Sequence, residues 1–183
     1  MMRDYLIISD SHGNKSRLDE VISYRRSLLK RDEVLDLIFL GDGLGDLFSS
    51  RHYDGIIVHA VRGNCDATDR FSPYGEEIPL YSVMSIGSHK ALLCHGHTLS
   101  VKYGYDELCR EASRLGANIA IFGHTHLPTL EYIKKGSIRG VDRDITIFNP
   151  GALSSFEGSF GNLCISDGGI LFSHGRFHNI SRE

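Results

Sequence analysis

Two histidines one residue apart, His124 and His126, are the first residues of this sequence that suggest chemistry. They follow an apolar run over residues 118–122, which is typical of a buried strand, and Gly123 ends that run. Imidazole is the commonest metal ligand in proteins, so a His-x-His pair at a strand end predicts half of a metal site. The alternative is a pair of solvated loop histidines. The rest of the chain decides between the two by the ligands it supplies.

Further oxygen and nitrogen ligands follow other predicted strands. Any one of them alone could be a turn or capping residue. In open α/β sheets, however, binding sites gather outside the carboxyl ends of strands, and a glycine beside each motif lets the backbone turn sharply there. Five successive strand ends with ligand chemistry therefore favour one shared site. The candidate ligands are Asp10, His12, Asp42, Asn64, His95, His124 and His126.

The donor types indicate two metal ions. Two carboxylates, four imidazoles and one amide oxygen are too many ligands for one tetrahedral zinc. They suit two ions about 3.5–4 Å apart that share a bridging group. A carboxylate is the natural bridge, because its charge serves both cations. Oxygen and nitrogen ligands without a thiolate favour manganese, with nickel, cobalt, iron, magnesium and zinc as alternatives.

Length and composition bound the class of protein. The 183 residues are expected to form a single domain over 1–183. A formal charge of -3 argues against a general affinity for nucleic acid, although a small phosphorylated substrate fits it. The sequence has no apolar run of membrane-spanning length, no signal peptide at its start and no Cys-x-x-Cys pair among its four cysteines. We therefore expect a cytoplasmic protein with reduced thiols and no membrane partner.

The predicted strands alternate with helices in the first half of the chain and form mainly hairpins in the second half. A helix that Asn14 or Ser16 caps should extend to about Lys30, and a second over residues 105–115 should end at Gly116. The first half suits strands joined by helical crossovers, and the second half suits antiparallel pairing, which two packed sheets with helices outside would accommodate. The late hairpins offer edges through which copies of the chain could form a homo-oligomer. Strands are expected over residues 4–9, 35–40, 56–61, 81–86, 90–94, 118–122, 130–133, 144–148, 162–165 and 170–173.

The ordered motifs resemble the signature of the calcineurin-like metallophosphoesterase superfamily. Small size, Arg-Gly-Asn-Cys-Asp at 62–66, His-Gly-His at 95–97 and Asn-Pro-Gly at 149–151 are similar to the YfcE-type prokaryotic phosphodiesterases. The resemblance implies an α/β (α+β) fold, a four-layer αββα sandwich of two mixed β-sheets flanked by helices. It assigns one metal to Asp10, His12 and His126, the other to Asn64, His95 and His124, and the bridge to Asp42. The motifs are Asp10-x-His12, Gly41-Asp42, Gly63-Asn64-x-Asp66, His95 and Gly123-His124-x-His126.

The same resemblance implies a phosphodiesterase in which a hydroxide bridging two metals attacks phosphorus. Arg62 and His97 are candidates for binding phosphate oxygens, although they could equally be a surface charge and a supporting histidine. Cys65 is a departure from the family pattern, because many members have a histidine at this position. The resemblance implies that this histidine is the general acid and that the carboxylate at the next position, here Asp66, orients it. A protonated thiol could donate a proton, but it is less suited to this than imidazolium. We therefore expect a preference for diesters or for substrates with good leaving groups. A small packed thiol is the alternative for Cys65.

Two other functions stay open from the sequence. A nuclease of the same superfamily would need a basic groove or an extra nucleic-acid domain, and the sequence shows neither. A non-catalytic interaction scaffold, like the retromer subunit that resembles this fold, would have an altered metal set. All seven ligand positions are filled here, which favours catalysis.

Overall fold

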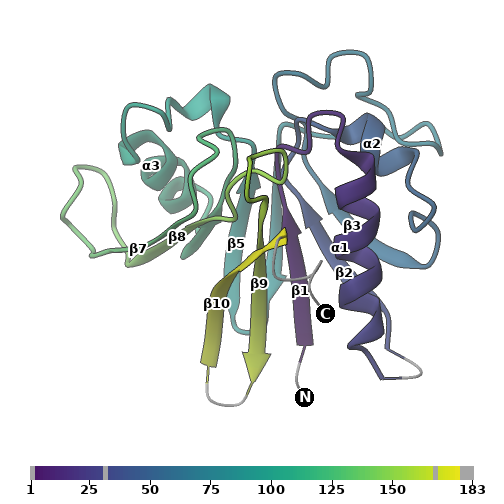
Figure 1. Ribbon diagram of the computed structural model, residues 1–183. Coiled ribbons are helices and arrows are strands. Elements are labelled where there is room, and N and C mark those ends of the chain that lie inside the picture. The colour runs from purple at the N-terminus through teal and green to yellow at the C-terminus, as the bar shows by residue number, and fades with distance from the viewer. Residues whose placement is uncertain (1–2, 31–32, 167–168, 178–183) are drawn as a thin grey trace.

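Two mixed β-sheets pack face to face in the computed structural model, which describes residues 3–30, 33–166 and 169–177 (Figure 1). The helices are α1 (Lys15–Ser27), α2 (Leu44–Phe48), α3 (Asp106–Arg114) and the 3₁₀ turn η1 (His97–Leu99). The strands are β1 (Arg3–Ile8), β2 (Leu35–Phe39), β3 (Ile56–Ala60), β4 (Tyr81–Ile86), β5 (His89–Cys94), β6 (Ile119–Ile121), β7 (Thr129–Ile133), β8 (Ile145–Asn149), β9 (Ser159–Ser166) and β10 (Gly169–Arg176).

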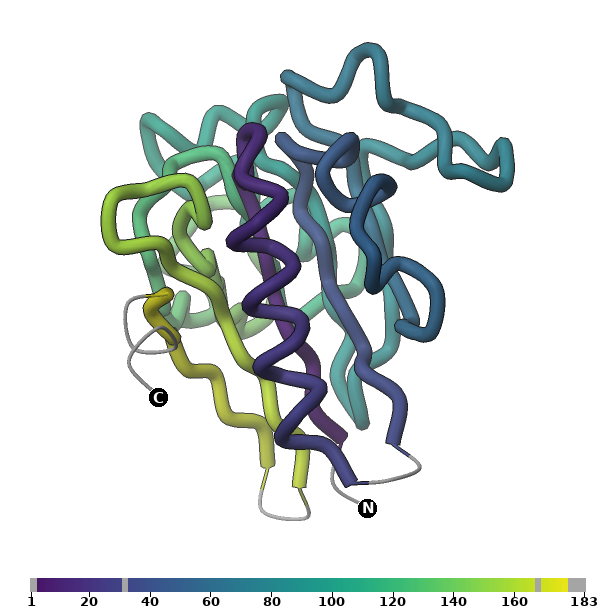
Figure 2. The backbone as a smooth tube through the Cα atoms, turned by 45° about the vertical axis from the view of Figure 1, so that its right-hand side comes forward, coloured from purple at the N-terminus to yellow at the C-terminus, as the bar shows by residue number. Residues whose placement is uncertain are grey.

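The strand order is β10-β9-β1-β2-β3 in the first sheet and β4-β5-β6-β8-β7 in the second. The three strands β1, β2 and β3 run parallel, as do β5, β6 and β8. Antiparallel pairs join β9 to β1, β10 to β9, β4 to β5 and β7 to β8, so both sheets are mixed. With α1 and α2 on one outer face and α3 on the other, the predicted αββα sandwich is confirmed (Figures 1 and 2).

Three apolar clusters hold the layers together. Ile7, Ile38 and Phe148 belong to the cluster between the two sheets. A second cluster joins Leu18 and Val21 of α1 to the outer face of the first sheet, and a third lies under α3. Each fully buried leucine, isoleucine or phenylalanine contributes roughly 1.5–3 kcal/mol relative to an exposed one. These layers therefore form a rigid base for the loops above the strands.

Three predicted elements, α1, β9 and β10, differ from the structure by more than one residue at an end. Helix α1 ends at Ser27 rather than near Lys30. Asn14 occupies the N-cap position, as one of the two predicted candidates, but its side chain makes no capping hydrogen bond to the helix. Strands β9 and β10 are longer than expected. Gly161 interrupts the apolar pattern of β9, yet it pairs with Ile7 of β1 in the sheet. A Cβ at this position would lie 2.5 Å from the Phe148 ring, which favours glycine there. The turn predicted between them includes residues 167–168, which lie outside the described residues.

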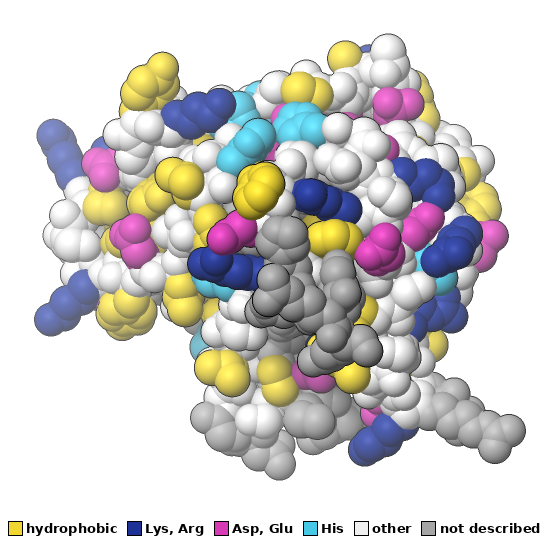
Figure 3. Space-filling view, in the orientation of Figure 1, with side chains coloured by type: hydrophobic (Ala, Val, Ile, Leu, Met, Phe, Trp, Pro, Cys, Tyr) yellow, Lys and Arg dark blue, Asp and Glu magenta, His cyan; other side chains and the backbone are white. Residues whose placement is uncertain are grey.

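Parallel pairing brings strand ends of both sheets to one edge of the molecule. The loops that follow β1, β2, β3, β5 and β6 all leave from this edge, at the top of Figure 1. Histidine side chains reach the surface there (Figure 3). In the part of the chain that the structure describes, no helix is both long and apolar enough to cross a bilayer.

Candidate metal centre

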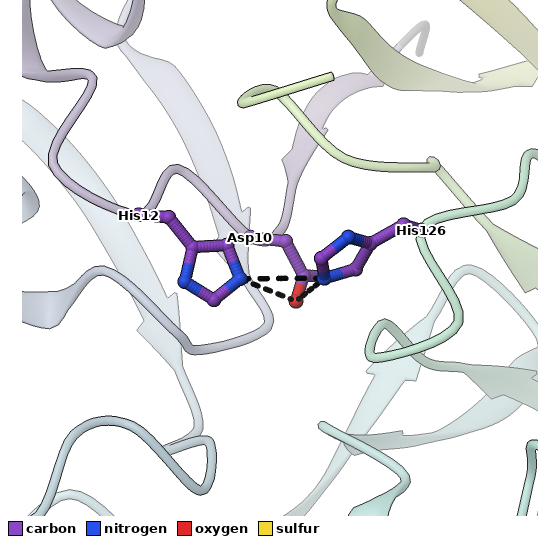
Figure 4. Close-up of side chains that lie close together, drawn as sticks. All are labelled: Asp10, His12 and His126. Atoms are coloured by element: carbon purple, nitrogen blue, oxygen red, sulfur yellow. Dashed lines mark hydrogen bonds and ion pairs between the residues drawn. The ribbon is translucent and has the colours of Figure 1, made fainter.

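Asp10, His12 and His126 form one cluster of donor atoms at this edge (Figure 4). His126 Nε2 lies 3.1 Å and His12 Nε2 3.6 Å from Asp10 Oδ1, and the two ring nitrogens are 3.3 Å apart. Ligands about 2.1 Å from one ion are about 3.0 Å apart at right angles and about 3.4 Å apart at tetrahedral angles. The three atoms thus have the spacing that a single ion needs.

Asp42, His95 and His124 form a second cluster beside the first. His95 Nε2 lies 3.3 Å from Asp42 Oδ2 and 3.9 Å from Asp10 Oδ1. His95 Nδ1 is 2.7 Å from the backbone oxygen of Leu40, and a carbonyl can only accept, so this nitrogen carries the proton. Nε2 consequently faces the two carboxylates, and in the neutral imidazole its lone pair is free to bind a cation.

Two buried atoms of these clusters fit a cation. Asp10 Oδ1 and His95 Nε2 make no hydrogen bond, although both side chains are buried. An unsatisfied buried polar atom costs about 1–3 kcal/mol, and a cation at each cluster would supply the missing partner of each atom. The donors are carboxylate oxygens and imidazole nitrogens, with Cys65 near enough to His12 and Asp42 to form a third group. The residues present therefore fit divalent metal.

The protonation of the second cluster follows from burial and from neighbouring charge. Burial alone would raise the pKa of Asp42, but His95 and the backbone N–H of Cys65 outweigh it and lower that pKa. Burial opposes a charged His95, yet Asp42 and Asp10 raise its pKa. Burial and then the charge of His95 lower the pKa of His124 to about 4. His124 is therefore a neutral imidazole, ready to bind metal, at neutral pH.

The backbone of the ligand loops is strained. Among the described residues, six that are not glycine have a positive φ, and five of those are candidate ligands. The left-handed region costs an ordinary residue roughly 1–2 kcal/mol, and such strain persists only where surrounding contacts enforce it. The five and their φ angles are Asp10 (56°), His12 (45°), Asp42 (55°), His124 (67°) and His126 (61°).

Side chains that sequence reasoning missed hold these loops. Asp46 accepts hydrogen bonds from Ser11 Oγ (2.6 Å) and Gly13 N (2.9 Å), on either side of His12. Ser9 Oγ donates to Asp10 Oδ2 at 2.5 Å. The sequence does place Ser9 and Ser11 next to Asp10, and Asp46 close to Asp42, but it does not show which groups these side chains bind.

Asn149, at the end of β8, supports the histidine loop after β6. Its Nδ2 donates to the Gly123 oxygen at 2.8 Å and to Thr125 Oγ1 at 3.0 Å. Its Oδ1 accepts from Gly151 N at 2.8 Å, and the side chain is fully buried. The Asn-Pro-Gly motif found in the sequence thus fixes the loop that carries two candidate ligands.

The turn after β3 brings Asn64, Cys65 and Asp66 alongside Asp42. Asn64 is exposed and its Nδ2 donates to Cys65 Sγ at 3.2 Å, while Cys65 N donates to Asp42 Oδ1 at 2.7 Å. Partial desolvation, followed by the Asp42 carboxylate, raises the pKa of the Cys65 thiol. Asp66 is buried and points its carboxylate at backbone N–H groups.

Arg62 and His97 lie at the rim of the same centre. The His97 ring is 5.4 Å from that of His95, and its Nδ1 is buried without a hydrogen bond. Burial, and then the charge of His95, lower the pKa of His97, with Arg62 contributing in the same direction. Arg62 Nη1 also donates to Glu77 Oε1 at 2.9 Å, so part of its guanidinium is engaged by the 67–79 loop.

The αββα fold and the clustered donors together define a metal-binding domain of the metallophosphatase type. Residues 4–167 match the calcineurin-like phosphoesterase superfamily domain, and the chain belongs to that superfamily. The probable metallophosphoesterase YsnB of Bacillus subtilis (strain 168) is 31% identical over 140 residues, which are 73% of this chain and 74% of YsnB.

Solved structures share the fold. A conserved protein from Streptococcus pneumoniae TIGR4, described as a predicted phosphoesterase, aligns with a TM-score of 0.68 and 23% identity, covering 97% of this chain and 91% of its own. Vacuolar Protein Sorting 29 from Cryptosporidium parvum aligns with a TM-score of 0.61 and 21% identity, covering 96% and 97%. Because a predicted phosphoesterase and a vacuolar sorting protein share this fold, the fold alone does not determine function, which has to be argued from the site.

Proposed function

We propose that this protein is a phosphodiesterase that hydrolyses small phosphodiesters with two divalent metal ions, preferably manganese. The observation that carries the proposal is the pair of adjoining donor clusters with buried, unpartnered atoms at Asp10 and His95. Asp10, His12 and His126 would hold one ion, and Asn64, His95 and His124 the other, with Asp42 as the bridge. Two such ions activate a water for attack on phosphorus and neutralise charge on the phosphate.

The chain's own side chains would bind and orient the phosphoester. Arg62 and His97 stand on the His95 side of the centre, where the guanidinium and an imidazole N–H can donate to phosphate oxygens. On the other side, His12, Asp42 and Cys65 line an open depression of about 220 Å³. A leaving group placed there would lie beside the Cys65 thiol.

Cys65 is proposed to supply the proton for the leaving oxygen. Its raised pKa keeps the thiol protonated at neutral pH, so it has a proton to give. A thiol is a weak donor compared with imidazolium, so substrates with good leaving groups should be preferred. Replacing Cys65 by histidine should raise turnover of diesters with poor leaving groups, and an unchanged rate would remove Cys65 from this role.

Metal-dependent turnover of a chromogenic phosphodiester tests the main proposal. The purified protein is stripped with a chelator, reloaded with Mn²⁺, Ni²⁺, Co²⁺, Mg²⁺ or Zn²⁺, and assayed against diesters and monoesters. Asp42→Asn should abolish turnover, because it removes the charge between the two clusters, and surviving activity would overturn the site assignment. A metal-loaded protein that hydrolyses none of these esters would instead favour a non-catalytic scaffold.

A further inference from the structure

Asp66 is engaged by the backbone of two ligand loops at once. Its Oδ2 accepts hydrogen bonds from Asp42 N at 2.7 Å and Gly63 N at 2.8 Å. Its Oδ1 accepts from Gly43 N and Leu44 N, each at 2.9 Å. The side chain is 2% exposed, so these four bonds replace water around a buried charge.

The shape of the two loops explains why a carboxylate is needed there. Asp42 and Gly43 both have a positive φ, which turns successive N–H groups toward one point and makes a small anion-binding concavity. The loops are also in direct contact, since a Cβ on Gly41 would lie 2.3 Å from Gly63 N. One buried carboxylate between them therefore fixes the turn after β2 to the turn after β3.

The geometry does not direct Asp66 toward the thiol beside it. Both carboxylate oxygens already accept two backbone N–H groups each. Among the hydrogen bonds of the described residues, none joins Asp66 to the Cys65 side chain. The Cys65 thiol faces the Asp42 carboxylate, and Cys65 N donates to Asp42 Oδ1 at 2.7 Å, so this turn contacts the metal cluster without any bond from Asp66 to the thiol.

We propose that Asp66 is a positioning residue for the metal centre, which acts by holding Asp42 in its left-handed turn and not by orienting Cys65. The inference rests on the proposed function only in taking Asp42 as a metal ligand. It predicts that loss of the Asp66 carboxylate weakens metal binding whether or not a thiol is present at position 65.

A double-mutant cycle with Mn²⁺ binding as readout separates the two roles. Asp66→Asn is made in the natural chain and in a Cys65→Ala chain, and Mn²⁺ affinity is measured by titration calorimetry without substrate. Outer partners of metal ligands typically contribute about 10–100-fold to affinity, and the same factor is expected in both chains. Unchanged Mn²⁺ affinity, or a defect that disappears in the Cys65→Ala chain, would overturn the inference.

Asp36→Asn is the matched control. Asp36 is also a buried carboxylate, 5% exposed, but it lies near the start of β2 and binds the Arg3 guanidinium through both oxygens. Its replacement should lower stability and leave Mn²⁺ affinity unchanged. If Mn²⁺ binds normally and no phosphodiester is hydrolysed, the proposed function fails while the inference on Asp66 stands.

One measurement requires no substitution and therefore no assumption that the variant folds. The amide protons of Asp42, Gly43, Leu44 and Gly63 should exchange slowly with solvent in the metal-free protein, because all four are bonded to one buried carboxylate. Hydrogen exchange followed by NMR measures them individually. Fast exchange at these four positions, with the neighbouring strands protected, would refute the inference.

Discussion

Replacing Asn149 with alanine tests whether the Asn-Pro-Gly turn supports the metal centre. The substitution removes the bonds donated to Gly123 O and Thr125 Oγ1 and the bond accepted from Gly151 N. The side chain is fully buried, so water cannot readily replace these partners. The loop after β6 then loses its side-chain attachment to β8.

The magnitude follows from the three bonds. Each contributes about 1 kcal/mol to stability, so Asn149→Ala should lower the free energy of unfolding by about 3 kcal/mol. In a chain of this length, 1 kcal/mol corresponds to about 2–4 °C in Tm, so Tm should fall by about 6–12 °C. Urea unfolding in the presence of a chelator measures the loss without any contribution from metal.

The same substitution should also weaken Mn²⁺ binding. His124 and His126 have left-handed backbone conformations, and a loop freed from Asn149 can relax out of them. By analogy with other outer partners of metal ligands, we expect a loss of about 10–100-fold in affinity, measured by calorimetry.

Asn118→Ala provides the control for this prediction. Asn118 Oδ1 accepts from Lys90 N at 3.0 Å and its Nδ2 lies 2.7 Å from His89 Nδ1, at the start of β6 and away from the ligands. Its loss should lower stability by about 2 kcal/mol and leave Mn²⁺ affinity unchanged. The reasoning is refuted if Asn149→Ala costs less than about 1 kcal/mol, or if both variants lose Mn²⁺ affinity equally.

Three further measurements follow from the structure. Gly63→Ala should lower Mn²⁺ affinity and turnover together, because the added Cβ would lie 2.0 Å from Asp42 Oδ1. Iodoacetamide at pH 8 should label exposed Cys65 in the native protein, but more slowly than free cysteine, because the pKa of Cys65 is raised. It should not label Cys94, which is buried and whose pKa of about 12 leaves almost no thiolate. In the metal-free protein, the pKa of His124 is about 4 in the folded state and about 6.5 in the unfolded state, so between these pH values His124 binds more protons when unfolded. The free energy of unfolding should therefore fall as the pH is lowered through this range, and it should fall less in His124→Gln.

Each of these measurements has a contrary outcome. Gly136→Ala is the control for Gly63→Ala, since its Cβ would meet no atom within 4 Å and only its φ of 79° is strained. Equal effects of both variants on Mn²⁺ affinity would contradict the crowding argument. Mass spectrometry that finds Cys94 alkylated in the native state would contradict its burial. An unchanged pH slope of the urea midpoint in His124→Gln would show that another group causes the acid sensitivity.

The ends of the strands could be predicted from the sequence because buried strands appear as apolar runs and the turns after them contain glycine. The apolar runs that became β1, β2 and β6 need no polar face inside a covered parallel sheet, and glycine marks the turn that follows. The ends of α1 and β9 were less predictable. Their limits depend on contacts distant in sequence, such as Gly161 against the Phe148 ring.

The supporting contacts could not be predicted, because they depend on which loops meet. Asp66 stands one residue from Cys65 in the sequence, and adjacency there indicates an orienting partner for the thiol. In the structure its oxygens reach backbone N–H groups more than twenty positions away, at Asp42, Gly43 and Leu44. Carboxylate chemistry is visible in a sequence, but the partner of a carboxylate is a property of the fold.

The two candidate-ligand carboxylates, Asp10 and Asp42, each use one oxygen as a hydrogen-bond acceptor and present the other to imidazole nitrogens. Asp10 Oδ2 accepts from Ser9 Oγ and His124 N, and Asp42 Oδ1 accepts from Cys65 N. The other oxygen of each lies among imidazole nitrogens, with Asp42 Oδ2 3.8 Å from His12 Nε2 and 3.3 Å from His95 Nε2. Since each cluster supplies one of those two histidines, Asp42 Oδ2 lies between the clusters. A negative charge in that position could bind both cations, which supports the proposal of Asp42 as the bridge. Asp10 Oδ1 also borders both clusters, 3.6 Å from His12 Nε2 and 3.9 Å from His95 Nε2.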